Sequence, residues 1–470
     1  MDVPTTFARF VPPVPPPPAG ELTTLRFVAT MRTNAIAGWP EAAYRERILR
    51  RRVLGRTRLT VSDPAAVRHV LVDRTDNYVR TAITIRLLRP ILGDGLLISE
   101  GAAWRHQRRT LAPAFAPRAV EALVPHIAAA TDEVLPALAA AGAEGPIDLF
   151  AALQRLTLEI AGRTMFSLGM ARHGERLRAF VERYGTRHAA PRALDALLPR
   201  WIPSPSDLGR ARFRRAWVGF LDEVVAERAR GNGPGTGDPS RDDPSDTDPG
   251  KGDLLHRLRV ARDPDTGRGF TPDDLRDQVA TLMLAGHETT AVTLLWACTL
   301  LALMPQTQDA VAREVRAAGP HAEPLRGLPL TRAVIEETMR LYPPAFAIAR
   351  RAVGSDTLAD TAVEPGDIVL IAPWLLHRHR GLWRDPEAFD AGRFLPEAPS
   401  PQRFAYLPFG AGPRICIGAG FALSEAVLIL ARLVAAFRIA RADDRPVLPM
   451  GVITTQPDHA PAFLLEPRRG

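Results

Sequence analysis

Apolar residues recur at three- and four-residue spacing along most of the chain, which is the pattern of helices with one buried face. The segments that show it are residues 64–72, 104–111, 119–141, 149–166, 175–184, 211–229 and 421–437. Two short runs, residues 58–61 and 368–371, instead favour strands, and turn residues precede the second. The pattern therefore predicts a mainly α fold with a small β-rich part.

The longest helix is predicted over residues 271–303. Thr271 supplies an N-cap, Pro272 occupies the first helical position and Asp274 the third. At about 1.5 Å per residue this helix spans close to 50 Å, and its apolar composition is typical of the centre of a large core. Its middle, residues 285–290, reads Ala-Gly-His-Glu-Thr-Thr, where several poor helix formers interrupt the apolar run. The interruption indicates a functional segment.

Two segments lack any helical or strand period. Residues 11–18 contain six prolines, which favours an extended N-terminal lead-in over residues 1–22. Residues 231–253 are rich in Gly, Pro, Asp and Ser, and this composition predicts a mobile surface loop. With no internal repeat, residues 23–470 are expected to form one domain.

Composition narrows the class of protein. The chain has 470 residues, 46% of them hydrophobic, which is enough for a sizeable core. The net charge is +8, but Lys251 is the only lysine and the arginines are scattered, so we expect no nucleic-acid binding. Two cysteines exclude a disulfide framework. With no signal peptide and no apolar run of about 20 residues, we expect a cytoplasmic protein without an integral membrane anchor.

The most specific motif is residues 409–418, Phe-Gly-Ala-Gly-Pro-Arg-Ile-Cys-Ile-Gly. Its glycines allow tight turns and a close approach to a flat ligand. Cys416 lies just before the helix predicted over residues 421–437, where the positive end of the helix dipole favours the thiolate that ligates iron. The motif resembles the haem-binding signature F-x-x-G-x-R-x-C-x-G of the cytochrome P450 superfamily, soluble bacterial type, at all five fixed positions.

The resemblance implies a single-domain, mostly helical cytochrome P450 fold in which Cys416 ligates the iron of haem b (iron protoporphyrin IX). A thiolate ligand favours O–O cleavage. Trp104 and Arg108 resemble the family's W-x-x-x-R pair over the propionates, and His377 is a further propionate candidate. The other residues implied to bind the haem are Arg414, Arg350, Phe409, Gly410, Gly418 and Ala285.

Glu337 and Arg340 resemble the family's E-x-x-R pair. Positions i and i+3 share one face of a helix, although such pairs are usually solvated at the surface. The resemblance implies a buried structural triad with a later arginine, here Arg393. Ala391 and Gly392 depart from the usual Pro-Glu before that arginine, which affects the expected shape of the loop.

Residues 285–290 resemble the family's oxygen-activation segment. The small residues at 285 and 286 leave room beside a haem, Thr289 would orient a hydrogen bond to dioxygen, and Glu288 would deliver protons. A metalloprotease H-E-x-x-H pattern is excluded because residue 291 is alanine. Cys298, on the same helix, is expected to pack in the core.

These features predict a monooxygenase that inserts one oxygen atom of O2 into a hydrophobic organic substrate. Residues 82–98 and 344–348 are largely apolar, and analogy with bacterial relatives suggests a fatty acid or a terpenoid. No flavin or iron–sulfur segment follows residue 437, so we expect a monomer that receives electrons from a separate ferredoxin- or flavodoxin-type protein, attracted by Arg105, Arg109 and Arg432. The alternatives are a peroxide-driven haem-thiolate peroxygenase and a non-catalytic haem-binding or sensor protein.

Overall fold

The computed structural model describes residues 9–53, 55–166, 170, 173–188, 195, 202–229, 254–319 and 322–468. The loop predicted at 231–253 lies outside these residues. The described chain divides into two compact units, unit 1 (residues 1–79, 131–153 and 289–470) and unit 2 (residues 80–130 and 154–288). Every described strand belongs to unit 1, and the fold is mainly helical with a small β part, as predicted.

The helices that begin in unit 1 are α1 Thr24–Thr33, α2 Pro64–Arg68, α7 Leu149–Phe166, α13 Pro305–Ala318, α14 Pro329–Leu341, α15 Pro373–Leu376 and α16 Ala419–Ala436. Those that begin in unit 2 are α3 Ala82–Leu92, α4 Gly101–Leu111, α5 Pro117–Glu121, α6 Val124–Glu144, α8 Gly174–Arg187, α10 Pro205–Ala229, α11 Leu254–Val260 and α12 Pro272–Leu303. The boundary between the units falls within α6, α7 and α12, so each of these helices contributes to both.

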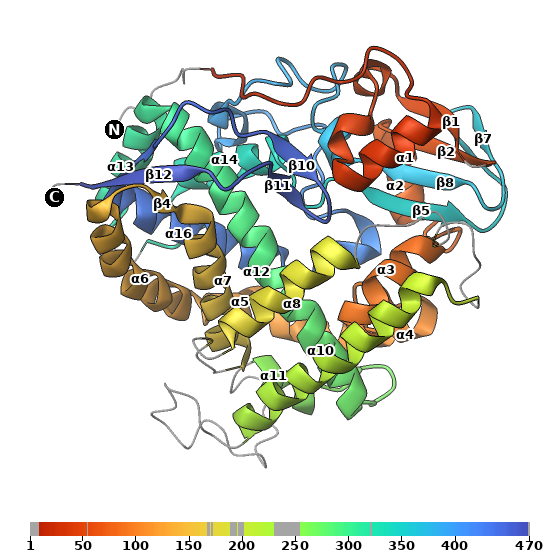
Figure 1. The fold of residues 1–470 in the computed structure, drawn as a ribbon, viewed down its shortest axis with the longest axis horizontal. Coiled ribbons are helices and arrows are strands. Elements are labelled where there is room, and N and C mark those ends of the chain that lie inside the picture. Colours follow the sequence, from red (N-terminus) through yellow and green to blue (C-terminus); the bar gives the residue numbers. More distant parts are fainter. Residues whose placement is uncertain are drawn as a thin grey trace. The chain divides into compact units, whose positions relative to one another are not determined.

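A five-stranded sheet with the order β1-β2-β8-β5-β3 forms one end of unit 1 (Figure 1). Its strands are β1 Ile48–Val53, β2 Arg56–Val61, β8 Ile368–Ile371, β5 Ile348–Ala352 and β3 Tyr78–Val79. Only β2 and β8 run parallel, and they are the two strands that the sequence pattern predicts. Leu59 and Val369 from these strands pack with Val67 of α2 in a buried apolar cluster. This cluster anchors the five-stranded sheet to α2.

The other strands of unit 1 form a three-stranded sheet and two hairpins. The sheet has the order β4-β12-β9 and comprises β4 Ile147–Asp148, β12 Ala462–Pro467 and β9 Phe437–Arg441. The hairpins are β6 Asp356–Leu358 with β7 Thr361–Val363, and β10 Pro449–Gly451 with β11 Thr455–Pro457. The proline-rich residues 11–18 contain no helix or strand, as predicted, and the carbonyl of Pro18 accepts a hydrogen bond from the Glu41 N–H at 3.0 Å.

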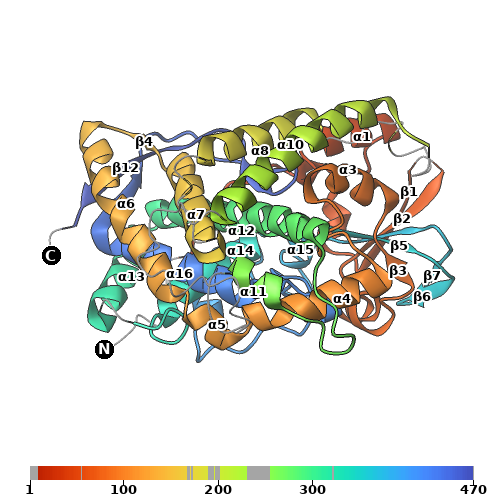
Figure 2. The ribbon, with the colours of Figure 1, turned by 90° about the horizontal axis from the view of Figure 1, so that it is seen from below.

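In unit 2, α8 and α10 lie side by side, and α3 packs against α10 (Figure 2). Phe180 of α8 contacts Trp217 of α10 edge to face, with 5.4 Å between ring centroids. The indole N–H of Trp217 donates to the carbonyl of Ile91 in α3 at 2.7 Å. These contacts join three helices that are distant in the sequence.

The predicted start of the long helix is confirmed. The Asp274 N–H donates to the Thr271 hydroxyl oxygen at 3.2 Å, and the Thr271 N–H donates to the Asp274 carboxylate at 3.0 Å. Each end of this capping box satisfies a backbone donor that the helix leaves unpaired. The helix then continues without a break for 32 residues.

The single helix predicted over residues 119–141 is wrong. The chain forms α5, which ends at Glu121, and α6, which begins at Val124. Pro125 explains the restart, because a proline disfavours helical geometry in the residue before it but fits the first turn of a new helix. Helix α3 was not predicted, because Pro90 and two arginines interrupt the apolar run.

Among the described residues, α16 is the one unbroken helix that is long and apolar enough to cross a bilayer by length and composition. Within that stretch 61% of the helix is buried inside the protein. The bent pair α12 and α13 also meets the criterion, with a 114° angle between the two helices. Core helices of folded proteins share these properties, so they are weak grounds for a membrane span.

Candidate functional site

The loop that carries Cys416 lies in unit 1, between a short 3-10 turn and helix α16. The Cys416 N–H donates to the carbonyl of Phe409 at 2.9 Å, which closes the loop on itself. A 3-10 turn at Gly412–Arg414 precedes the cysteine, and α16 begins three residues after it with Gly418 as N-cap. The thiol is exposed. An exposed sulfur is therefore presented just before the positive end of a long helix dipole.

Glycine is required at two positions of this loop. Gly410 and Gly412 have φ angles of +74° and +70°, which residues other than glycine adopt only at a cost in free energy. A Cβ atom at Gly412 would lie 2.0 Å from the backbone oxygen of Leu71. The motif spacing thus reflects a backbone that passes directly over the turn following α2.

The second cysteine is in a different environment. Cys298 is fully buried in α12, and burial raises the pKa of its thiol to about 12. A thiol in that state is neither a good nucleophile nor a good metal ligand. Among the described residues, Cys416 is thus the cysteine able to hold a metal, and Cys298 packs in the core as predicted.

The E-x-x-R pair is buried in unit 1. Glu337 and Arg340 of α14 form two hydrogen bonds of 2.7 and 2.8 Å, and both side chains are completely inaccessible to solvent. Arg340 also donates to the carbonyls of His377, Pro386 and Ala388. The pair therefore fastens α14 to the segment that leads toward the cysteine loop.

Arg393 joins this pair despite the unusual residues before it. Its Nε lies 3.4 Å from the Glu337 carboxylate. Asp390 starts a short 3-10 turn by accepting the Gly392 N–H, and its own N–H donates to Glu337 at 2.8 Å. The turn over Ala391–Phe394 thus brings Arg393 to the Glu337 carboxylate without the usual Pro-Glu before it.

His377 has a structural position rather than that of a propionate ligand. Its Nε2 accepts the Leu407 N–H at 2.8 Å, and its Nδ1 lies 3.2 Å from the carbonyl oxygen of Arg340. Both ring nitrogens are therefore occupied, and the ring is fully buried. Burial, assisted by the charge of Arg340, lowers the pKa of His377 to about 3. The propionate candidate suggested by sequence position is wrong.

The interruption of α12 does not break the helix, which continues through residues 285–290. Ala285 is exposed, Thr289 is half-buried one turn later, and Glu288 is buried. The Thr289 carbonyl accepts a hydrogen bond from the hydroxyl of Thr293 at 2.9 Å. Residues 285 and 289 share one face of the helix, so that face carries a small side chain and a hydroxyl at a four-residue spacing.

His287, in the same segment, faces into unit 2. Its ring Nδ1 lies 2.7 Å from the carbonyl oxygen of Met283, and its own carbonyl accepts the Thr157 hydroxyl at 2.9 Å. Burial lowers the pKa of the imidazole. The residue is therefore a neutral tie between helices, consistent with the exclusion of an H-E-x-x-H site.

The candidate propionate ligands lie in both units. Arg350 of β5 and Arg414 of the cysteine loop are half-buried in unit 1, and Arg350 donates to the Ala349 carbonyl at 3.0 Å. Trp104 and Arg108 are half-buried on α4 in unit 2, one turn apart. Each residue has the partial exposure that binding a ligand carboxylate requires.

Two of the three arginines expected to attract an electron donor are already paired. Arg109 forms bonds of 3.1 and 2.9 Å with the buried carboxylate of Asp263. Arg432 contacts Asp132 at 2.7 and 2.8 Å. Arg105 remains exposed on α4. Nearby carboxylates therefore balance the charges of Arg109 and Arg432, and Arg105 is the exposed one of the three.

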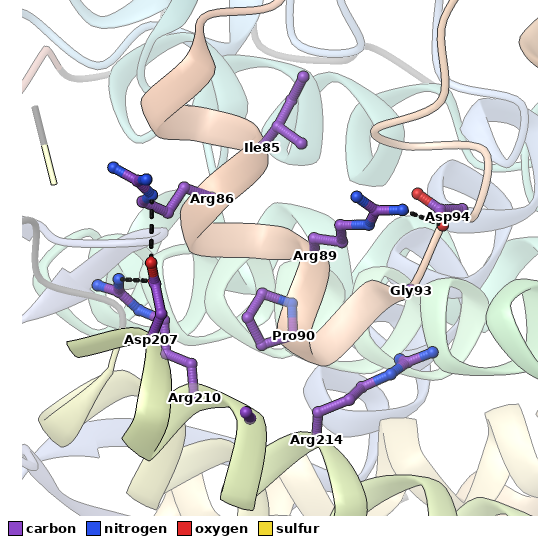
Figure 3. Close-up of a pocket in the computed structure, with 10 residues that line it drawn as sticks. Ile85, Arg86, Arg89, Pro90, Gly93, Asp94, Asp207, Arg210 and Arg214 are labelled. Atoms are coloured by element: carbon purple, nitrogen blue, oxygen red, sulfur yellow. Dashed lines mark hydrogen bonds and ion pairs between the residues drawn. The ribbon is translucent and has the colours of Figure 1, made fainter. Parts of the chain in front are cut away.

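A pocket of about 430 Å³ opens between α3 and α10 in unit 2 (Figure 3). The sequence predicts apolar walls from residues 82–98, but Arg86, Arg89, Arg210 and Arg214 line it together with apolar residues. These arginines form ion pairs, among them Arg89 with Asp94 at 2.7 Å. The apolar side chains Ile91 and Leu92 are instead buried in the core. Carboxylates of the protein thus balance the charges of these four arginines.

Sequence reasoning missed Glu425. This glutamate of α16 is 1% exposed, and its Oε2 accepts a hydrogen bond from the hydroxyl of Thr290 at 2.9 Å. Burial raises the pKa of its carboxyl to about 8. The signal available in the sequence is a single acid inside the apolar run 421–437, where a charge is costly.

A family model described as Cytochrome P450 matches residues 27–460. A cyclooctat-9-en-7-ol 5-monooxygenase of Streptomyces melanosporofaciens is 34% identical over 75% of this chain and 74% of its own. A leukotriene-B4 omega-hydroxylase 3 of Mus musculus is 31% identical over 83% of this chain and 76% of its own. The crystal structure of a cytochrome P450DA heme domain shares the fold, with a TM-score of 0.73, 24% identity, and coverage of 98% of this chain and 99% of that one.

Proposed function

Because the chain belongs to the cytochrome P450 family and is therefore a haem b monooxygenase, we propose that it hydroxylates a terpenoid or fatty-acid substrate. In this reaction one atom of O2 is inserted into a C–H bond of the substrate. Two electrons and two protons reduce the other atom to water. The observation that carries the proposal is the exposed Cys416 thiol in a glycine-built loop before α16.

The residues present fit haem b. The donor set is one thiol, which would supply the sulfur ligand of the iron, and Gly412 lets the loop that carries it pack directly against the backbone of Leu71, where a Cβ atom would clash. In unit 1, Arg414 and Arg350 would hold the propionates through charged N–H donors. The bound haem supplies oxygen binding and activation. The chain's own contribution is to hold a hydroxyl at Thr289 and a carboxyl at Glu288 in successive positions of α12, where they orient and transfer protons.

Two relatives support the proposed substrate class. One relative is named for oxidation of cyclooctat-9-en-7-ol and another for hydroxylation of leukotriene B4, and both substrates are mainly hydrocarbon. These names favour a substrate that is largely hydrocarbon.

The assignment is tested by the absorbance of the reduced, carbon-monoxide-treated protein. We expect a Soret band at the position typical of sulfur ligation for the wild type and for Cys298→Ser, and its loss in Cys416→Ser. An unchanged band in Cys416→Ser would contradict the ligand assignment. A panel of terpenoids, fatty acids and polar aromatic compounds then tests the substrate class, because a binding substrate shifts the spin state of the iron.

We propose that electrons come from a separate acidic ferredoxin or flavodoxin and that Arg105 on α4 contributes to its docking. Arg105→Glu is then expected to slow reduction several-fold at low ionic strength and little at high ionic strength, because salt screens exposed charges. Arg438→Glu, which changes an exposed arginine of β9, is the matched control. Equal rates for wild type and Arg105→Glu at low salt would exclude this docking role. We further propose a cytoplasmic monomer, which size-exclusion chromatography and cell fractionation test.

A further inference from the structure

A buried acid that the proposed function does not use connects two helices of unit 1. Glu425 of α16 and Thr290 of α12 are 1% and 3% exposed, and the threonine hydroxyl donates to the carboxyl at 2.9 Å. Within the described residues, Glu425 forms no ion pair, and no other side chain bonds to it. A carboxylate without a cation in such a place is disfavoured, so the group is held mainly as the neutral acid.

The charges on neighbouring elements leave Glu425 without a counter-ion. Helices α13 and α14 and strand β9 pack against α16. On α14, Glu337 and Arg340 neutralise each other, and on α13 Glu314 accepts N–H groups at the start of α14. On β9, Arg441 is paired with a carboxylate beyond the strand. The pKa of Glu425 is raised by burial to about 8, with only the Thr290 hydrogen bond opposing this rise.

The position of this bond relates it to the chemistry. Helix α16 begins three residues after Cys416, and Glu425 lies about two turns further along the same helix. Its partner Thr290 directly follows Thr289, whose carbonyl accepts the hydroxyl of Thr293. One hydrogen bond therefore links the helix that follows the Cys416 loop to the segment of α12 that carries the Thr289 hydroxyl.

We propose that Glu425 is a positioning residue whose neutral carboxyl, through Thr290, holds the Thr289 segment of α12 at a set place relative to the Cys416 loop. This inference rests on the proposed function for its consequence in turnover. Ionisation of Glu425 would place an unpaired charge between the two helices, and the structure would then have to admit water or separate locally. The productive arrangement is thus present when the acid is neutral and is lost when it ionises.

The matched variants are Glu425→Gln and Glu425→Leu in the haem-loaded enzyme. Glutamine keeps a neutral oxygen that accepts the Thr290 hydroxyl, whereas leucine keeps the bulk but removes the acceptor. We expect Glu425→Gln to retain at least half of the wild-type ratio of product formed to O2 consumed, and Glu425→Leu to lose several-fold. Thr290→Val should lower the ratio of product to O2 as much as Glu425→Leu does. The double variant Glu425→Leu/Thr290→Val should have a ratio no lower than either single variant. Ser424→Ala, at the adjacent buried position, should resemble wild type.

The pH profile separates positioning from a general loss of stability. For the wild type, the ratio of product to O2 should fall as the pH rises through about 8, while Glu425→Gln should show no such fall. Infrared difference spectra of wild type against Glu425→Gln should contain a protonated-carboxyl band that disappears over the same pH interval. Equal pH profiles for wild type and Glu425→Gln, or wild-type behaviour of Glu425→Leu, would overturn the proposal.

Two readouts do not require turnover. The infrared band reports whether Glu425 is neutral. Amide hydrogen exchange at Thr289 and Thr290 reports whether α12 is held, with about tenfold faster exchange expected in Glu425→Leu and little change in Glu425→Gln. If these results hold while no substrate is oxidised, the proposed function fails and the positioning contact stands. If the protein hydroxylates its substrate but both readouts are unchanged by the variants, only the positioning role fails.

Discussion

Replacing Glu337 with glutamine tests the most completely buried ion pair of unit 1. The substitution changes size very little and removes one negative charge, which leaves the Arg340 guanidinium without its carboxylate. Both side chains are 0% exposed, so water cannot take the place of the lost charge. Arg340 keeps the hydrogen bonds that it donates to three backbone carbonyls, which limits the damage.

The expected cost follows from the burial. Removal of one partner of a buried ion pair typically destabilises a protein by about 3 to 5 kcal/mol. The retained carbonyl bonds place Glu337→Gln near the lower end, about 3 kcal/mol, which corresponds to on the order of a hundredfold change in the unfolding equilibrium. Arg393 also loses its contact with the carboxylate, 3.4 Å away. Loosening of the segment that leads to the cysteine loop should therefore accompany the loss of stability.

The neighbouring Glu336 provides a matched control on the same helix. It pairs with Arg332 at 3.1 Å, but Arg332 is 41% exposed, so this pair resembles the surface pairs that contribute about 0 to 1 kcal/mol. Burial raises the pKa of Glu336, so neutralising it removes a charge that the protein already disfavours. Glu336→Gln should change stability little.

Urea unfolding, followed by circular dichroism and by the Soret absorbance, measures both effects. The midpoint for Glu337→Gln should fall clearly below those of wild type and Glu336→Gln, and haem should dissociate faster from it. If the two glutamine variants unfolded at the same urea concentration, the inference that burial makes the Glu337–Arg340 pair structurally decisive would be refuted.

Three further outcomes are expected. Gly412→Ala should lower haem retention and stability, because its +70° φ costs about 1 to 2 kcal/mol before the clash with backbone is counted; Gly420→Ala, with no atom within 4 Å of the added carbon, should be neutral or stabilising in the same urea assay. His377 should lower the free energy of unfolding by about 1.4 kcal/mol per pH unit as the pH falls from 6.5 toward 3, because it stays neutral when folded and takes a proton when unfolded; in thermal unfolding, the stability of His377→Gln should therefore fall less steeply with pH than that of the wild type. Thr271→Ala should cost about 1 kcal/mol by removing the cap of α12, and Thr271→Ser should restore it in urea titrations.

The long helix and the parallel strands were predictable because their signals are local. Apolar spacing and a capping box place α12, and β-branched residues after a turn place β8. The break between α5 and α6 was also encoded locally, by Pro125. The apolar spacing, however, continues across the break and therefore predicts a single helix. Helix α3 is different, since one of its two arginines, Arg86, pairs with Asp207, which is more than a hundred positions away.

Cys416, the glycines of its loop and the Glu337–Arg340 pair were identifiable from the sequence by itself, because short motifs preserve the spacing that their local geometry requires. Only the tertiary structure decided that His377 is a buried tie, that Arg109 is already paired with Asp263, and that Glu425 bonds to Thr290. The physical reason is that burial and partner choice depend on segments brought together by folding. The same side chain is a free charge, a neutral acid or half of an ion pair according to the neighbours it meets there.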